Sequence, residues 1–193
     1  MTQRICRQSL TSRARNRQSG YSLVEALIVV AIGLILTAFS VVMVQSALRN
    51  YTVTSTANAV SRFIGVVRYT GITQGANRCI LFAGNQFGAD PDCNGAFLND
   101  DQRVQVPAAM TVSQTTTLPL TSLPFNPAPT TVACSNFAVT FNTRGNKTSV
   151  CGAATGGAVT HVFFLSGWGI TSAVTVTGTG RARSWQFING AWQ

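Results

Sequence analysis

At 193 residues the chain has room for one core of ordinary size and a tail, but not for two full domains. It has only 14 Lys or Arg and 5 Asp or Glu, and 46% of its residues are hydrophobic, so neither charge-driven disorder nor the surface of a cytosolic enzyme fits. One histidine and five carboxylates leave most acid–base and metal-hydrolytic mechanisms without their groups, which makes an enzyme the weakest of the function classes.

The positive charge is concentrated at the N-terminus. Five arginines precede residue 20 without any acid, and residues 26–44 follow without a charged side chain. As a helix at about 1.5 Å per residue, this run spans about 28 Å, close to the hydrocarbon thickness of a bilayer. Because basic flanks stay in the cytoplasm, we expect a single membrane span whose N-terminal end stays in the cytoplasm while the rest of the chain is exported. The leader arginines are Arg4, Arg7, Arg13, Arg15 and Arg17.

The junction between the leader and the apolar run carries a specific motif. A cleaved secretory signal or an ordinary single-pass anchor would be the simpler interpretation. However, the run is longer than a signal core, and Glu25 at its start would be unfavourable in lipid without a partner charge. Residues 18–25 (Gln-Ser-Gly-Tyr-Ser-Leu-Val-Glu) resemble the prepilin cleavage motif of type IV pilins and type II secretion pseudopilins.

This resemblance implies a role for three residues. A membrane-embedded prepilin peptidase would cut after Gly20 and methylate the new N-terminus at Tyr21. Glu25, the fifth mature residue, would face the terminal amine of a neighbouring subunit during filament assembly, and an opposite charge is what a buried carboxylate needs. Tyr21 replaces the usual phenylalanine, and the first helix lacks the proline that many major pilins carry, which favours a minor subunit.

The helical pattern continues beyond the apolar run. Apolar residues recur at spacings of three and four on one face, namely at Val53, Ala57, Val60, Ile64 and Val67. Glycines at 71 and 75 mark the end of this pattern. We therefore expect one helix from residue 21 to about residue 73, divided into a transmembrane or filament-core half (21–48) and an amphipathic half (49–74), after a leader at 1–20.

Residues 75–193 are predicted to form a periplasmic β-rich head. Short β-branched or aromatic runs bounded by Gly, Asn, Pro and Asp predict strands at 79–82, 103–106, 137–141, 161–165 and 173–177. Residues 143–146 indicate a hairpin turn, and 111–131 a long loop with at most one edge strand. The expected fold is α+β, a pilin-like ladle in which the long N-terminal helix packs on an antiparallel sheet.

Four cysteines remain once Cys6 leaves with the leader, in a compartment that permits disulfides. They allow three pairings. We favour Cys79 with Cys93 and Cys134 with Cys151, because both pairs close short loops and the second would join the two strands of the predicted hairpin. No pair has the two-residue spacing of a zinc knuckle, and no cofactor is expected.

An acidic segment matches part of a calcium-loop pattern. Its residues fall on positions 1, 3, 5, 6 and 12 of the loop, as Asp90, Asp92, Asn94, Gly95 and Asp101. Asp stands in place of the bidentate Glu, and neither flank indicates a helix. An acidic surface turn is therefore the favoured interpretation, with calcium binding as the alternative.

The C-terminal segment carries a second resemblance. Residues 137–145 and 173–183 resemble the paired strands of the family that joins the H-type pseudopilins (GspH) with FimT, and 180–183 (Gly-Arg-Ala-Arg) matches the signature with which FimT-like pilins bind DNA. This resemblance implies DNA contact by Arg181 and Arg183. On a strand the two would share one face and grip phosphates without sequence preference. A solvated strand face is the alternative.

The wider composition of the head agrees with an anionic partner. No acid follows Asp101, whereas Arg103, Arg144 and Lys147 add to the two arginines and favour a positive potential. The aromatic residues Trp185, Phe187 and Trp192 would either stack on bases or belong to a docked edge strand. His161 is expected to be structural.

Three functions follow. The first is a FimT-like minor pilin that binds duplex DNA during natural transformation. The second is a GspH-type minor pseudopilin at the tip of the type II secretion pseudopilus. The third, a membrane-anchored periplasmic enzyme, lacks catalytic residues. The expected partners are other pilins or pseudopilins, the prepilin peptidase, the inner membrane and, for the first function, duplex DNA.

Overall fold

The computed structural model describes residues 22–95, 102–125, 129–131, 138–151, 153–154 and 159–193. The chain divides into two compact units, Met1–Met43 and Val44–Gln193. One continuous helix, α1 (Leu23–Gln74), belongs to both units. It begins two residues after the predicted start and ends one residue after the predicted end.

In the first unit, α1 is an apolar helix whose side chains are exposed along its whole length. Its few hydroxyl groups bond to the carbonyls of the helix itself: Thr37 Oγ1 donates to Gly33 O at 2.9 Å, and Ser40 Oγ donates to Leu36 O at 2.9 Å. Such bonds leave no hydroxyl without a partner in an apolar surrounding. By length and composition, this helix is able to cross a membrane.

In the second unit, α1 buries the face that the sequence predicts. Val53, Ala57, Val60, Ile64 and Val67 are each at most 4% exposed. Gly75 ends the helix with a φ of 61°, and Ala76 N–H donates to Gly71 O while Gly75 N–H donates to Ile72 O. This is the Schellman arrangement, which satisfies carbonyls at the helix end.

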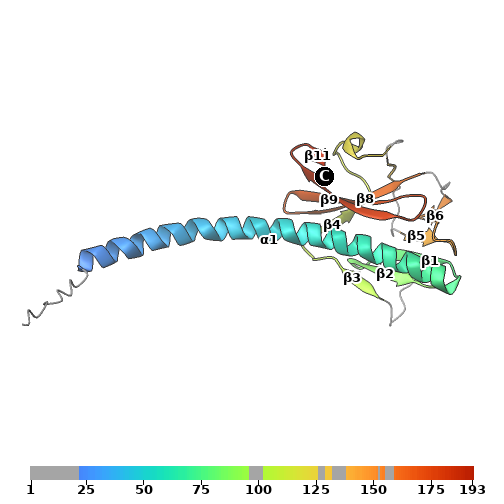
Figure 1. The fold of residues 1–193 in the computed structure, drawn as a ribbon, viewed down its shortest axis with the longest axis horizontal. Coiled ribbons are helices and arrows are strands. Elements are labelled where there is room, and N and C mark those ends of the chain that lie inside the picture. The colour runs from blue at the N-terminus through green and yellow to red at the C-terminus, as the bar shows by residue number, and fades with distance from the viewer. Residues whose placement is uncertain (1–21, 96–101, 126–128, 132–137, 152, 155–158) are drawn as a thin grey trace, which may run out of the picture. The chain divides into compact units, whose positions relative to one another are not determined.

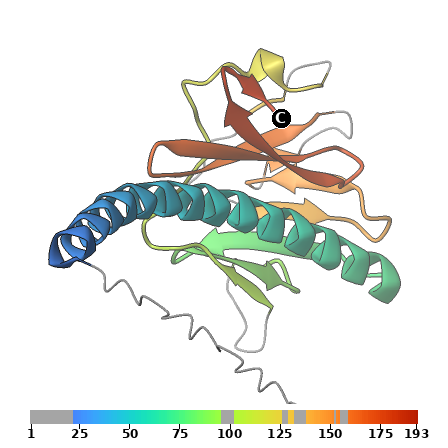
Figure 2. The same cartoon turned by 60° about the vertical axis from the view of Figure 1, so that its left-hand side comes forward.

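Two antiparallel sheets pack against this half of α1 (Figure 2). The first sheet has the order β3-β2-β1-β5-β6-β7, and the second has the order β11-β10-β9-β8-β4. Figure 1 labels most of these strands. The first sheet consists of β1 (Arg78–Ala83), β2 (Gln86–Asp90), β3 (Arg103–Gln105), β5 (Ala138–Phe141), β6 (Lys147–Val150) and β7 (Ala153–Ala154). The second consists of β4 (Thr111–Ser113), β8 (His161–Gly167), β9 (Ile170–Val176), β10 (Ala182–Ile188) and β11 (Ala191–Trp192).

The core has two parts because β8 is buried on both faces. Phe163 and Leu165 pack with the buried face of α1 and with both sheets, while Val162 and Phe164 pack with Trp192 in a second cluster. No buried residue of either cluster precedes Val53. The unit Val44–Gln193 therefore contains the complete core of the described chain.

The predicted fold class is confirmed: a long N-terminal helix packs on antiparallel sheets. All five predicted strands are present, as β1, β3, β5, β8 and β9. The turn expected at 143–146 joins β5 to β6, with Gly145 at a φ of 74°. The long segment 111–131 contains the short edge strand β4 and one turn of 3-10 helix (Leu120–Ser122). Strand β6 follows the predicted hairpin turn, and β10 and β11 carry the aromatic residues for which a docked edge strand was one interpretation. Strands β2 and β7 were not predicted.

Candidate nucleic-acid interface and assembly segment

The assembly segment is described only in part. Gly20 and Tyr21 lie outside the described residues, whereas Glu25 stands in the first turn of α1 and is exposed. A carboxylate is favourable there because the N-terminus of a helix carries partial positive charge. Its neighbours Leu23 and Val24 are 76% and 61% exposed. The first turn of α1 thus places an acid among exposed apolar side chains.

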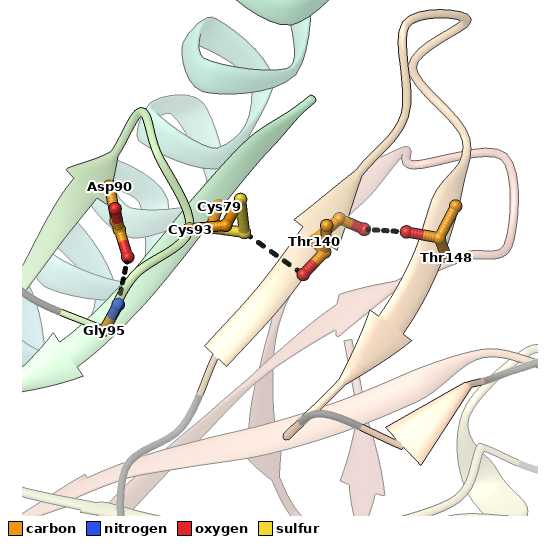
Figure 3. The surroundings of a disulfide bond; sticks show 6 residues. All are labelled: Cys79, Asp90, Cys93, Gly95, Thr140 and Thr148. Atoms are coloured by element: carbon orange, nitrogen blue, oxygen red, sulfur yellow. Dashed lines mark hydrogen bonds between the residues drawn. A yellow bond between two sulfur atoms is a disulfide. The ribbon is translucent and has the colours of Figure 1, made fainter. Parts of the chain in front are cut away.

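The cysteines fix the loop after β2. Cys79 and Cys93 form a disulfide with a Cα–Cα distance of 5.2 Å, the pairing favoured from the sequence (Figure 3). Thr140 on β5 lies 3.1 Å from the Cys79 sulfur, measured at Oγ1. Cys151 is also disulfide-bonded, and its favoured partner Cys134 lies outside the described residues.

The acidic segment is held by the same loop. Asp90 is 2% exposed, and its Oδ2 accepts a 2.7 Å hydrogen bond from Gly95 N–H (Figure 3). Asp92 and Asn94 are exposed, and Asp101 lies outside the described residues. Within the described ranges, no group of three or more His, Cys, Asp or Glu could hold a metal ion. In this structure the described part of the segment acts as a capped turn.

The hairpin between β9 and β10 positions the two candidate DNA-contacting arginines. Gly180 N–H donates to Thr177 O at 2.9 Å, and Arg181 N–H donates to Thr177 Oγ1 at 3.1 Å. Arg181 is the last residue of this turn, and Arg183 is the second residue of β10. Both side chains are exposed. The turn thus presents two guanidinium groups to solvent at one end of the second sheet.

A glycine is required at the start of this basic motif. Gly180 has a φ of 78°, and a Cβ placed on it would lie 2.1 Å from Gly145 O and 2.7 Å from Arg68 Nε. Arg68 Nε in turn donates to Gly145 O at 2.8 Å. The turns of both hairpins and helix α1 therefore meet at Gly180. This contact explains physically why glycine precedes the arginines.

Strand β10 is held against helix α1. Ser184 Oγ donates to Asn58 Oδ1 at 2.5 Å, and Gln186 Nε2 donates to Asn50 Oδ1 at 3.5 Å. One edge of β10 pairs with β9. Its other edge is paired only near the end of the strand, where Gln186 and Gln193 exchange two backbone hydrogen bonds and β11 begins. Alternate residues of an antiparallel strand turn their backbone groups to the same side. Ala182 and Ser184 thus face an edge without a strand partner in the described chain.

A groove lies between α1 and this open edge, and it brings in a residue that the sequence analysis did not single out. Arg62 on α1 lines the groove together with Arg183 on β10. The helical periodicity indicated only that Arg62 points away from the main core. Its proximity to a strand some 120 residues later depends on the strand order, which no local pattern encodes.

The N-terminal segment matches a known family. A family model described as the prokaryotic N-terminal methylation motif matches residues 15–41, which include Gly20, Tyr21 and Glu25. The chain is pilin-like. The pilin-like chain joins this motif to a continuous helix on antiparallel sheets, as its resemblance to type IV pilins and pseudopilins implied.

Comparison with curated sequences and with solved structures finds similarity only among the solved structures. No curated protein sequence matches the pilin-like chain. Two crystal forms of the type IV minor pilin FimU of Pseudomonas aeruginosa are similar in structure at 10% sequence identity. One match covers 75% of this chain and 94% of that chain with a TM-score of 0.48. The other covers 72% of this chain and 95% of that chain with a TM-score of 0.47.

One basic residue of the pilin-like head is not at its surface. Lys147 is 1% exposed, and its Nζ donates to Val159 O at 2.8 Å. Burial lowers the pKa of Lys147 to about 8. Lys147 was expected to favour a positive potential of the head. The structure encloses its ammonium group, so this lysine offers no exposed group for contact with a partner.

The aromatic side chains near the C-terminus are docked. Trp192 is 5% exposed and contacts Phe164 and Phe187, with ring centroids 5.8 and 5.1 Å apart. Trp185 packs edge-on against Phe125 and donates from Nε1 to Thr175 Oγ1 at 2.9 Å. These rings complete the second cluster rather than form an open surface for stacking on bases.

Proposed function

We propose that this chain is a minor pilin of the FimT type, whose head binds duplex DNA through Arg181 and Arg183. In this proposal the prepilin peptidase cuts after Gly20 and methylates Tyr21. The apolar half of α1 anchors the subunit in the inner membrane until it enters a filament, and Glu25 then meets the terminal amine of a neighbouring subunit. The head lies in the periplasm.

The exposed arginine pair carries the DNA-binding part of the proposal. Arg181 and Arg183 form no ion pair within the described residues, and Gly180 fixes the turn that presents them. Guanidinium groups bind phosphate oxygens with charge-assisted hydrogen bonds. Because these contacts address the backbone of DNA, binding would be independent of sequence and sensitive to salt. One subunit supplies few contacts, so several subunits in a filament would add avidity.

A GspH-type minor pseudopilin is the second candidate. The open edge of β10, at Ala182 and Ser184, favours it, because a free strand edge is able to pair with a strand of another protein. In that role the basic pair would serve protein contacts within a secretion filament, and DNA binding would be absent.

A gel shift with the unit Val44–Gln193 separates these candidates. We expect duplex DNA to bind at low salt, and the double variant Arg181→Gln/Arg183→Gln to abolish the shift, since it removes both phosphate contacts. Arg49→Gln/Arg103→Gln is the charge-matched control, because Arg49 and Arg103 are exposed on α1 and β3. Equal DNA binding by the Arg181/Arg183 variant and the wild type would refute the assignment of DNA contact to these two arginines.

A further inference from the structure

Trp168 differs from the other two tryptophans of the head. It lies between β8 and β9, is 43% exposed, and its indole makes no hydrogen bond or ring contact with another described residue. The indole N–H groups of Trp185 and Trp192, by contrast, both donate to protein oxygens at 2.9 Å. Trp168 therefore turns an apolar ring with an available N–H group to the outside of the head.

The turn that carries Trp168 favours a different residue. Trp168 and Gly169 have φ values of 53° and 78°, and Gly167 is opposite Ile170 across the turn. A two-residue hairpin turn with both φ values positive favours Asn-Gly, because a bulky side chain is strained in the left-handed region. The backbone geometry thus gives no reason for a tryptophan here, and residues that violate a local preference are expected at functional sites.

The second sheet fixes the position of this turn along α1. Ser184 of β10 bonds to Asn58 of the helix. Two residues later, Gln186 bonds to Asn50, so β10 runs toward the N-terminal end of α1. Strand β9 is antiparallel to β10, with Ser172 opposite Gln186. The first residues of β9, and the β8–β9 turn before them, therefore lie toward the same end of the helix.

The apolar run of α1 finishes at this end of the unit. The run ends at Val44, the first residue of the unit, and Asn50 follows after six residues, or about 9 Å along the helix. Trp168 precedes Ser172 by four residues, so the turn extends past Asn50 toward Val44. The surface of a bilayer crossed by the run is therefore close to the level of Trp168. Tyr51, which is 72% exposed, adds a second aromatic ring at this end.

We propose that Trp168 docks into the surface of the bilayer that α1 crosses, with its ring among the upper acyl chains and its N–H group among the headgroups. Tryptophan and tyrosine are enriched at this depth because they combine an apolar ring with a polar group. The helix keeps the turn close to the lipid, so the high effective concentration populates even a small contact. The proposal rests on the membrane anchoring in the proposed function and is independent of DNA binding.

A neighbouring subunit is the poorer candidate for this contact. A stable protein interface uses about 20 residues on each side. The turn offers one large side chain between two glycines, Gly167 and Gly169. A single ring is enough to enter lipid next to a membrane-spanning helix, because the helix already supplies the anchoring.

The test reconstitutes the full chain in vesicles of phosphatidylethanolamine and phosphatidylglycerol whose acyl chains are brominated near the headgroups, since bromine quenches tryptophan fluorescence at short range. We expect the wild type to emit less light than in unbrominated vesicles of the same composition. Trp168→Asn should lose this quenching and keep the fold, because Asn-Gly is the pair that the turn favours. Trp185→Phe is the matched control, since it also removes one tryptophan but should keep the quenching.

Each outcome decides one point. Equal quenching of the wild type and Trp168→Asn would overturn the inference, because the signal would then come from the docked tryptophans. Absence of quenching in the wild type would also overturn it, and a blue shift of the emission that grows with the ratio of protein to lipid would then identify a neighbouring subunit as the contact. Flotation of the vesicles tests the anchoring separately. A wild-type chain that does not float with the lipid would refute the anchoring in the proposed function together with the inference.

Discussion

His161 is buried beside a buried lysine, which makes the stability of the head dependent on pH. Its Nε2 is a buried atom without a hydrogen-bond partner, and Nδ1 lies 3.3 Å from Thr130 Oγ1. Burial, together with the positive charge of Lys147, lowers the pKa of His161 from 6.5 to about 4, and a backbone hydrogen bond at Thr130 opposes the shift. The unfolded chain therefore binds a proton at a higher pH than the folded chain, so acid favours unfolding.

We expect the free energy of unfolding of the unit Val44–Gln193 to fall by about 1–2 kcal/mol as the pH drops from 6.5 to 4, with no further loss from this residue below pH 4. His161 is the only histidine, so His161→Gln should remove most of the dependence in this window. Urea unfolding at pH 4.5 and pH 7 measures the effect. An equal pH dependence in both chains would show that the imidazole is not its source.

At the scale of elements, the β9–β10 hairpin depends on the contact between its turn and the β5–β6 turn. Besides the close approach of Gly180 to Gly145, Lys147 N–H donates to Gly178 O at 2.9 Å. A side chain at position 180 would push the two turns apart and displace the adjoining arginines. Local strain and a packing clash would then act together.

Gly180→Ala should therefore lower the free energy of unfolding by about 2–4 kcal/mol. Gly169→Ala provides the matched control, because Gly169 has the same φ of 78° but no atom within 4 Å of its added Cβ. Gly169→Ala should lower the free energy of unfolding by only about 1 kcal/mol, because its side chain adds the strain of a left-handed backbone but no clash. Denaturant unfolding compares the two variants, and equal losses would mean that the clash with Gly145 is relieved without a penalty.

The sequence predicts elements well where one physical signal dominates. The period of 3.6 identifies the buried face of α1 from Val53 to Val67, an apolar aromatic run identifies β8, and a β-branched run identifies β9. Strand β2 was not predicted because Gly88 interrupts its apolar pattern and its ends are polar. The burial of Lys147 was not predicted for a different reason. A lysine on a short strand indicates an exposed side chain, and only the hydrogen bond to Val159 O shows that this one is enclosed.

The candidate site was predictable only in its local part. Gly180, Arg181 and Arg183 form one contiguous motif, so the sequence alone indicates them. Arg62 lines the same groove as β10 only because the strand order of the second sheet and the bond between Ser184 and Asn58 bring that strand to α1. Contacts between segments so far apart in the chain depend on tertiary packing, which a local periodicity does not specify.

At the scale of the whole molecule, the account depends on processing at the N-terminus. The methylation motif at 15–41 covers the end of the basic leader and the first part of α1. Removal of the leader would delete five arginines and expose an amine four residues before Glu25. In the proposed function, that amine would be the counter-charge that allows an acid to enter an apolar filament core.

The intact mass of the protein purified from its own cells tests this claim most directly. We predict a chain from Tyr21 to Gln193 that carries one added methyl group on its terminal amine. A chain that still begins at Met1, or one cleaved at a site after the apolar run, would contradict the account.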